Sequence, residues 1–353
     1  MIKRKPRVLI VATSSKTRGG ITAVIKSYQS NKIWSDWDCK WIETHIDKNI
    51  VFKGFFFVRS VISFIGLVQK SSLVHIHLSA PVSAIRKYPF LVIAKNFKVP
   101  IIIHFHAFSE ESTIDKKHFN LYNKIFRMAD TIIVLSESWK KGIVKDLNIS
   151  SDKIEVLYNP CPKISFDNKI KKTNTILYAG ALINRKGFKD LIYSFAIIAK
   201  SNPEWKLIFA GNGEINEGIQ LSKELNIEHQ VVFKGWVSGR EKNQLFSEAT
   251  LFCLPSYAEG FPMAILDAWA YGLPVISTPV GGVPEIAIDG VNMVLFNSGD
   301  INSLSDKLKI MISDCVLRNK ISKASFEFSL HKFSLNTITN QLESIYKKNI
   351  NCM

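Results

Sequence analysis

The sequence contains few cysteines, and no two of them stand at the spacing of a metal-binding or redox pair. The five cysteines are scattered along the chain, with no C-x-x-C pair and no histidine at metal-ligand spacing (Cys39, Cys161, Cys253, Cys315 and Cys352). This distribution excludes a disulfide framework or a zinc finger and favours a reducing cytoplasm. Low-complexity tracts and short-period repeats are also missing. The 353 residues suit two domains of ordinary size.

An uninterrupted membrane span is missing as well. The apolar stretch of residues 50–68 is broken by Lys53 and Arg59, so it predicts a poor spanning helix. Two interpretations stay open: a core helix packed on a sheet, or an amphipathic helix lying partly on a membrane. Near the start, the apolar run Val8–Ala12 is too short for a signal peptide. We expect it to be the first buried strand.

Acidic residues are scarce in the first half. Residues 1–168 hold 26 Lys and Arg against 13 Asp and Glu, a net charge of +13, whereas residues 169–353 have a net charge of +3. A basic surface attracts an anionic bilayer, a polyanion or nucleic acid. No aromatic–basic alternation typical of a nucleic-acid reader is present, so we expect no nucleic acid. The protein is expected in the cytoplasm, in peripheral contact with the inner face of an anionic membrane.

Short apolar runs alternate with helical stretches in both halves. Expected strands lie at residues 8–12, 74–77, 101–104 and 131–135, with a further candidate at 40–43, and again at 175–178, 207–210, 231–234, 250–254, 274–277 and 293–296. Expected helices lie at residues 22–29, 55–69, 84–97, 120–129, 187–201, 215–225, 240–248 and 263–271. Strands alternating with helices predict two doubly wound, Rossmann-like α/β domains that face each other across a cleft. The prolines of Asn159-Pro160-Cys161-Pro162 mark the expected hinge.

The segment Pro255–Glu285 carries most of the functional signal. A strand runs into a turn with Glu259 and Gly260-Phe261-Pro262, and a helix then opens near Met263. Free backbone N–H groups and the positive end of the helix dipole meet there, which suits a phosphate. Asp267 follows Glu259 by eight residues, so two carboxylates flank the phosphate position. This layout fits a nucleoside diphosphate joined to a sugar.

The same segment resembles the E-x7-E signature of retaining glycosyltransferases with the GT-B fold, in glycosyltransferase family four (glycosyl transferases group 1). The resemblance implies that Glu259 and the backbone of Gly260, Phe261, Pro262 and Met263 hold the donor sugar and its phosphates. It implies that Asp267 binds the ribose hydroxyls. Family members carry Glu at that second position, and Asp267 is one methylene shorter.

Three further turns of the second half match the family. Gly180 follows an expected strand, and the cations Arg185 and Lys186 come shortly after it, which suits a diphosphate leaving group. The family commonly has Arg directly after this glycine, where Ala181 stands here. Gly211, in the turn Gly211-Asn212-Gly213-Glu214, resembles a turn near the nucleotide. Trp236 and Val237 resemble the segment that borders the base.

The first half supplies two more candidates. Gly19 and Gly20 lie between the first strand and a helix, where the backbone can approach donor phosphate or acceptor. They do not form G-x-G-x-x-G, which argues against a dinucleotide site. His106, in the run His104–Phe108, matches the family histidine that faces donor sugar hydroxyls. We expect His75, His77 and His104 to be core residues.

No metal site is expected. No carboxylate completes a ligand set near the four histidines. Asp36-Trp37-Asp38 reads as D-x-D, a metal–diphosphate motif of a different glycosyltransferase fold. It lies in an expected polar loop with no phosphate turn around it, so we interpret it as a chance match.

The sequence therefore predicts a metal-independent, retaining hexosyltransferase without a cofactor. Its expected donor is a nucleotide sugar, and a UDP-sugar is favoured over a GDP-sugar. Its expected acceptor is a glycan or a polyprenyl-lipid-linked glycan of a bacterial surface polysaccharide. Residues 1–165 are the expected acceptor domain, with the helix of residues 332–353 packing back on it, and residues 166–331 the donor domain. Two alternatives stay open. One is a GT-B nucleotide-sugar 2-epimerase; the other is a catalytically silent, nucleotide-binding partner of a transferase.

Overall fold

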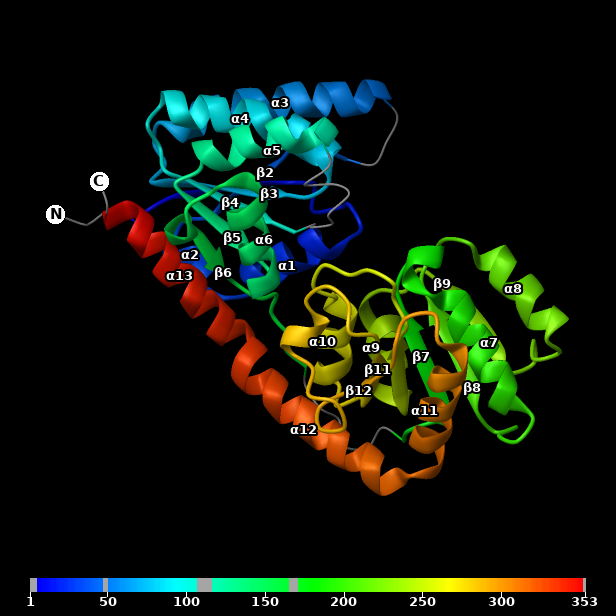
Figure 1. Cartoon of the computed structure of the whole chain (residues 1–353). Coiled ribbons are helices and arrows are strands. Elements are labelled where there is room, and N and C mark those ends of the chain that lie inside the picture. Colours follow the sequence, from blue (N-terminus) through cyan, green and yellow to red (C-terminus); the bar gives the residue numbers. More distant parts are fainter. Residues whose placement is uncertain (1–4, 47–49, 107–115, 165–170, 352–353) are drawn as a thin grey trace. The chain divides into compact units, whose positions relative to one another are not determined.

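The chain forms two compact units (Figure 1). The structure, a computed structural model, describes residues 5–46, 50–106, 116–164 and 171–351. The first unit comprises Met1–Pro160 and Leu335–Met353, and the second comprises Cys161–Ser334. The division thus falls at residues 160 and 335, a few residues from the positions 165 and 332 expected from the sequence. The chain leaves the first unit inside the Asn159–Pro162 segment.

The first unit is built on one parallel sheet. Its strands follow the order β2-β1-β3-β4-β5-β6. They are β1 (Val8–Ala12), β2 (Lys40–Glu43), β3 (Leu73–Leu78), β4 (Ile101–Phe105), β5 (Thr131–Val134) and β6 (Ile154–Val156). The strands β1, β3, β4 and β5 are buried along their whole length, as segments rich in Val, Ile and Leu predict for a sheet covered on both faces.

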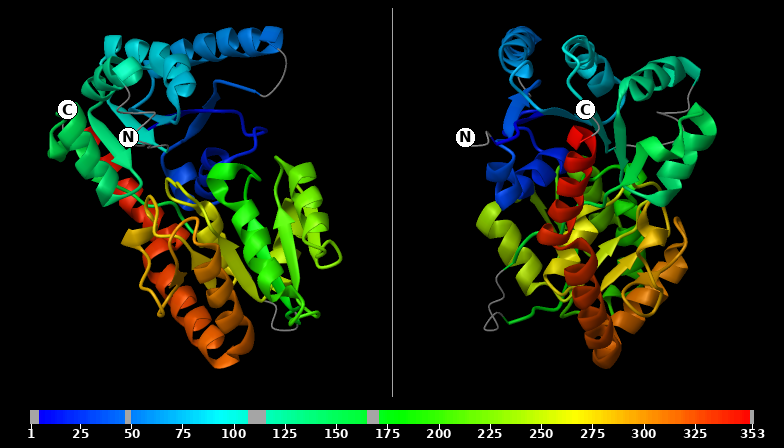
Figure 2. Two further views of the ribbon diagram at one scale, coloured as in Figure 1. Left: turned by 45° about the vertical axis from the view of Figure 1, so that its right-hand side comes forward. Right: turned by 90° about the vertical axis from the view of Figure 1, so that its left-hand side faces the viewer.

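Helices cover both faces of this sheet. They are α1 (Gly20–Gln29), α2 (Lys32–Asp36), α3 (Ile50–Val68), α4 (Pro81–Asn96), α5 (Lys116–Met128), α6 (Glu137–Leu147) and α13 (Leu335–Asn351). Figures 1 and 2 show α3, α4 and α5 on one face and α1 and α13 on the other. The last helix therefore packs with strands that lie far from it in the sequence.

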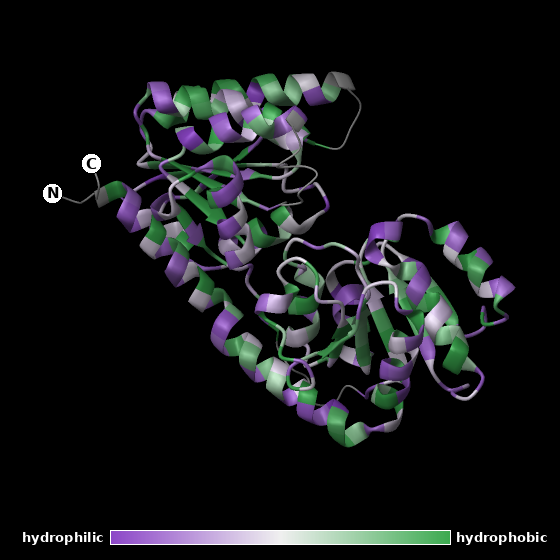
Figure 3. Cartoon of the chain, in the orientation of Figure 1, coloured by the Kyte–Doolittle hydropathy of each residue, from purple (hydrophilic) through white to green (hydrophobic). Residues whose placement is uncertain are grey.

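The helix α3 has one buried and one exposed apolar side. Phe64 and Val68 are fully buried, and the Phe64 ring packs edge-on against Phe90 of α4 with 5.1 Å between ring centroids. The opposite side exposes further large apolar side chains (Phe52, Phe55, Val58, Ile62 and Ile65). Figure 3 shows hydrophobic colour along much of this helix. Within the described residues, no helix combines the length and the apolar character that crossing a bilayer requires.

The second unit repeats the architecture. Its parallel sheet has the order β12-β11-β10-β7-β8-β9. The strands are β7 (Thr175–Ala179), β8 (Lys206–Ala210), β9 (Val231–Gly235), β10 (Leu251–Leu254), β11 (Val275–Ser277) and β12 (Val294–Leu295). The helices are α7 (Phe188–Ala199), α8 (Ile215–Glu224), α9 (Gly239–Glu248), α10 (Met263–Ala270), α11 (Ile301–Ser313) and α12 (Cys315–Phe333). The expectation of two doubly wound α/β domains is confirmed.

Several elements differ from the sequence expectation. The strand β6 and the helices α2, α6, α11 and α12 have no counterpart in it. With three residues, β6 is too short for a periodic pattern. Asp36 ends the helix α2 rather than lying in a loop, and Asp38 pairs with Arg7 and Lys40. Trp37 between them is buried, so the D-x-D residues belong to the packing of the first unit.

Candidate functional site

The turn predicted to bind phosphate lies at the carboxyl end of β10. Glu259 sits between β10 and α10, and α10 begins at Met263 with Pro262 before it and no side chain capping its first turn. The N–H groups of that turn therefore face the position that the sequence assigns to a phosphate. Tyr257, Ala258 and Gly260 keep the loop accessible, although Glu259 itself is only 9% exposed.

The predicted cations contact this loop. Arg185 and Lys186 belong to a short 3-10 helix, η3 (Asn184–Lys186), that follows β7. Lys186 Nζ forms an ion pair with Glu259 Oε1, and Arg185 Nη1 donates a hydrogen bond of 2.6 Å to the Ala258 carbonyl oxygen. The Tyr257 N–H in turn donates to the Arg185 carbonyl at 2.8 Å. Residues 73 positions apart in the sequence are thus joined at one point.

Two residues that the sequence analysis left unassigned hold Glu259. Ser256 Oγ donates a hydrogen bond of 2.6 Å to Glu259 Oε1. Gly281, in the loop after β11, has a φ of +59° and lies against the Glu259 backbone. A Cβ atom built there would come within 1.8 Å of the Glu259 carbonyl oxygen. Only glycine combines this backbone angle with this close approach. The pair Gly281-Gly282 after an expected strand is the sequence feature that could have indicated this close contact.

The second carboxylate, Asp267, lies in the helix that follows the Glu259 loop. Asp267 is in the second turn of α10, and its side chain is 13% exposed. Burial raises the pKa of this carboxyl group above its ordinary value, and Lys242 of α9 lowers it in opposition. The Lys242 Nζ to Asp267 Oδ2 distance is 2.7 Å. The sequence analysis assigned no role to Lys242.

The remaining predicted residues of the second unit lie at the same edge of the sheet. Gly180 follows β7, and its N–H donates to the Ala210 carbonyl at 3.0 Å. Gly211 follows β8, where an added Cβ would come within 1.7 Å of the Gly180 carbonyl oxygen. Trp236 is exposed and Val237 half-buried in the loop after β9. Because all six strands are parallel, these loops gather at one edge, where α/β sheets bind ligands.

In the first unit the four histidines form one stacked cluster. His75 and His77 lie on β3, and His104 on β4 pairs in register with His77. The ring of His104 stacks on that of His106 with 4.2 Å between centroids, and His77 Nδ1 lies 2.8 Å from His106 Nε2. His106 follows β4 and is half-buried. Burial lowers the pKa of His75 and of His106 to about 3, so both imidazoles are neutral at physiological pH.

Three of these histidines offer the best metal-ligand geometry among the described residues. Ring nitrogens of His75, His77 and His104 lie within 4.8 Å of one another. A zinc ion bound at 2.0–2.1 Å needs nitrogens about 3.4 Å apart. The set has no anionic ligand, and the rings are stacked rather than converging. Buried Lys87 adds a cation beside it, donating hydrogen bonds to the His77 carbonyl and to Ser83 Oγ. The geometry therefore favours a core of neutral imidazoles.

Gly19 and Gly20 lie at the same edge of the first sheet as His106. Both are exposed, and Gly20 opens α1 directly after the loop that follows β1. Ala107 and Phe108 of the predicted histidine run lie outside the described residues, as do residues 165–170 of the connector. The predicted residues thus form two sets, one at the carboxyl edge of each sheet.

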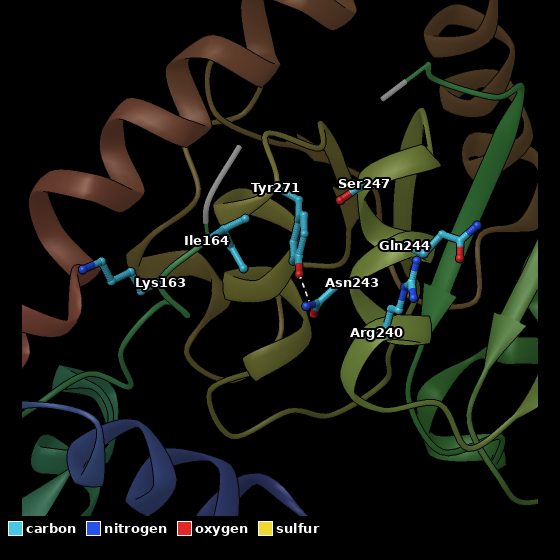
Figure 4. Close-up of a pocket in the computed structure, with 7 residues that line it drawn as sticks. All are labelled: Lys163, Ile164, Arg240, Asn243, Gln244, Ser247 and Tyr271. Carbon is cyan, nitrogen blue, oxygen red and sulfur yellow. Dashed lines mark hydrogen bonds between the residues drawn. The ribbon is translucent and has the colours of Figure 1, made fainter. Parts of the chain in front are cut away.

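A separate pocket of about 540 Å³ opens beside α9 in the second unit (Figure 4). None of the predicted site residues lines it. Tyr271 Oη donates a hydrogen bond of 2.8 Å to Asn243 Oδ1 across it. The lining residues are Lys163, Ile164, Arg240, Asn243, Gln244, Ser247 and Tyr271.

Two family profiles match the chain, one in each half. The family profile "Glycosyl transferases group 1" matches residues 162–328, and "Glycosyltransferase Family 4" matches residues 45–162. The capsular polysaccharide biosynthesis glycosyltransferase CapM of Staphylococcus aureus is 29% identical, over 65% of each chain. The lipopolysaccharide 1,6-galactosyltransferase of Salmonella typhimurium is 33% identical, over 56% of this chain and 57% of that one. Both matches span less than two thirds of the relative.

Among solved structures, that of Anabaena HepE in complex with UDP superposes with a TM-score of 0.76 at 16% identity. It covers 97% of this chain and 100% of HepE. HepE has also been solved with UDP-glucose, with a TM-score of 0.72 and 17% identity, over 97% of this chain and 99% of that one. At such identities the likeness establishes the fold. The two profiles follow one another from residue 45 to residue 328. The chain belongs to the glycosyl transferases group 1 and has their GT-B fold.

Proposed function

We propose that this protein transfers a hexose from a nucleoside-diphosphate sugar, with UDP as the first candidate nucleotide, to a glycan or a polyprenyl-lipid-linked glycan. The proposal rests on one observation above all. Arg185 and Lys186 contact the Glu259 loop, and this loop leads into the uncapped N-terminal end of α10. Two cations, free backbone N–H groups and a helix dipole then surround one position, which suits a diphosphate.

Each of these residues has its own role in the proposed reaction. Breaking the bond between sugar and phosphate leaves negative charge on the departing diphosphate, and Lys186 and Arg185 stabilise it. Lys186 is paired with Glu259 in the ligand-free chain. A diphosphate competes for that lysine, and Glu259 is then available to orient sugar hydroxyls. Asp267 binds the ribose, and the family resemblance assigns a sugar hydroxyl to the neutral His106. Because cations of the chain supply the charge, the proposed reaction needs no metal ion.

Retention of the anomeric configuration is proposed from the resemblance to family four. The acceptor hydroxyl then attacks from the face that the diphosphate leaves. The names of CapM and the 1,6-galactosyltransferase favour a surface-polysaccharide acceptor. Nuclear magnetic resonance of the product tests this part: the anomeric coupling should match that of the donor, and an inverted coupling would contradict it.

The exposed apolar side of α3 supports contact with an anionic membrane. Phe55, Val58 and Ile62 are exposed there beside the exposed cations Lys53 and Arg59. Apolar side chains flanked by cations are typical of helices that lie at a bilayer surface. Sedimentation with phosphatidylglycerol vesicles should therefore carry the protein down, and Ile62→Asp should weaken this. Equal binding to phosphatidylcholine vesicles would contradict the charge argument.

The central experiment measures transfer with Lys186→Ala. A panel of UDP-, GDP- and ADP-sugars first identifies the donor by calorimetry. Turnover should then fall about 100- to 1,000-fold in the variant while the circular dichroism spectrum is unchanged. The control is Lys200→Ala, which removes an exposed lysine just after the carboxyl end of α7. Near-normal turnover of Lys186→Ala would remove this lysine from the site.

Three simpler assays test the metal-independent reaction and separate the proposal from its alternatives. Turnover in EDTA should equal that without it, and loss of activity would overturn the metal-independent reaction. Donor incubated without acceptor should stay unchanged, because an epimer would identify a 2-epimerase instead. Donor binding without transfer to any acceptor would favour a catalytically silent partner.

A further inference from the structure

Lys242 and Asp267 form an ion pair between neighbouring helices of the second unit. Lys242 lies on α9 and Asp267 on α10, with 2.7 Å between Nζ and Oδ2. The lysine side chain is 34% exposed, whereas that of Asp267 is 13% exposed. Lys242 Nζ also lies 5.5 Å from the ring centroid of Phe246, which is buried. The ring and the carboxylate together fix the end of the lysine side chain.

Lys242 favours the ionised form of Asp267. Burial raises the pKa of its carboxyl group, and Lys242 is the cation that opposes the rise. The other titratable groups that act on or feel this carboxylate are the Tyr271 hydroxyl on the same helix and the Cys161 thiol. Both are neutral at physiological pH, because burial raises the pKa of Tyr271 to about 12 and that of Cys161 above its ordinary value. Without Lys242, the carboxylate would be buried with no cation beside it.

The pair also fixes the direction of a short side chain. Lys242 bonds Asp267 Oδ2, so the rotation of the carboxylate is set and Oδ1 is the oxygen left for a ligand. The family signature has a glutamate here, and aspartate reaches one methylene less far. A shorter side chain tolerates less misdirection, because it cannot bend back towards a hydroxyl.

We propose that Lys242 is a positioning residue for the ribose of the nucleotide. It keeps Asp267 ionised and aims its free oxygen at the ribose hydroxyls, without touching the nucleotide itself. This inference rests on the proposed function, in which Asp267 binds ribose. It assigns to α9 a role in nucleotide affinity that the matched signature does not contain.

The test compares nucleotide affinity in two variants of Lys242. Lys242→Met keeps the length of the side chain and removes its charge, and Lys242→Arg keeps the charge. Calorimetry should show UDP binding about tenfold weaker in Lys242→Met and largely restored in Lys242→Arg. The matched control is Lys189→Met, because Lys189 is also 34% exposed and pairs with Glu217 at 2.6 Å. Its UDP affinity should equal that of the wild type.

A second probe isolates the ribose. 2′,3′-Dideoxyuridine diphosphate lacks both hydroxyls, so Lys242→Met should leave its affinity unchanged. A general loss of structure would weaken both nucleotides equally and would overturn the proposal. In an Asp267→Asn background, Lys242→Met should have little further effect on UDP, since the two residues act as one unit. Additive losses in the double variant contradict it.

The pH dependence gives an independent readout. A protonated Asp267 accepts hydroxyl hydrogen bonds poorly, so UDP affinity falls as pH drops through the pKa of this group. Loss of Lys242 removes the effect that lowers this pKa, so the fall should begin at a higher pH in Lys242→Met than in the wild type. Coinciding pH profiles contradict the inference alone. If the wild type binds none of UDP, GDP and ADP, the proposed function fails together with it.

Discussion

Tyr346 Oη on α13 lies 2.7 Å from His75 Nδ1 on β3, although 271 residues separate them in the sequence. Tyr346 is 1% exposed, and its ring packs edge-on against Trp37 with 5.2 Å between centroids. Thr131 on β5 adds a second buried link to this helix, since its hydroxyl donates a hydrogen bond of 3.0 Å to Asn349 Oδ1. The last helix is thus part of the core beneath the histidine cluster.

Removal of the Tyr346 hydroxyl should loosen this attachment. Tyr346→Phe leaves His75 Nδ1 buried without its partner, which costs about 1–3 kcal/mol. Urea unfolding should show the lower stability, and hydrogen exchange should locate it in α13. The control is Tyr193→Phe, at a hydroxyl on a side chain that is 41% exposed, with an expected change within about 0.5 kcal/mol. Unchanged exchange in α13 would argue against the contact.

Lys87 should make the first unit more stable as pH rises from 7 to 10. Burial lowers its pKa from 10.5 to about 7. In that window the unfolded chain binds a proton that the folded chain does not, so the free energy of unfolding rises with pH. Lys87→Met removes this contribution. The wild-type-minus-variant difference in stability should grow by at least about 1 kcal/mol between pH 7 and 10. A difference that stays constant with pH contradicts the assignment.

Asp267 should lower the free energy of unfolding at neutral pH. Its pKa is raised in the folded state, so its favourable contribution exists below the unfolded value of 3.8 and is lost as pH rises through the folded value. Asp267→Asn should therefore raise the thermal midpoint at pH 7, by about 2–4 °C for each kcal/mol gained. The gain should vanish below pH 4, and nucleotide affinity should fall. A lower midpoint at pH 7 would show that the Lys242 pair outweighs the burial.

Gly281 and Gly290 offer a matched pair of substitutions. Both have a positive φ, of +59° and +70°, but an added Cβ has nothing within 4 Å at Gly290 and lies 1.8 Å from the Glu259 carbonyl at Gly281. Gly290→Ala should cost only about 1 kcal/mol through its backbone angle. Gly281→Ala should cost more and should also displace Glu259, which lowers donor turnover. Equal effects of the two substitutions on turnover would mean that this loop does not shape the site.

The strands and the phosphate turn could be predicted from sequence because their causes are local. The run Val8–Ala12 is apolar at every position, and β3, β4 and β5 are rich in Val, Ile and Leu and buried along their whole length, as a sheet covered on both faces requires. The Gly260–Met263 turn likewise depends on residues that are adjacent in the sequence. The identification of Glu259, Lys186 and His106 came from the family resemblance, and their roles stay predictions. The helices α11 and α12 were missed. In α12 two of the four buried positions are serines, so the sequence lacks the apolar period that marks one face of a helix.

What only the tertiary structure decided are the partners of each charged or polar group. Lys186 and Glu259 are 73 residues apart, and Lys242 and Asp267 are 25 apart. No spacing rule links them, because their contact depends on the order of strands in the sheet. The left-handed Gly281 and the Tyr346–His75 bond have the same origin. The sequence by itself determined the positions of the core strands and the turn that suits a phosphate. The folded chain determined which cation meets which carboxylate, because that follows from packing between elements distant in the sequence.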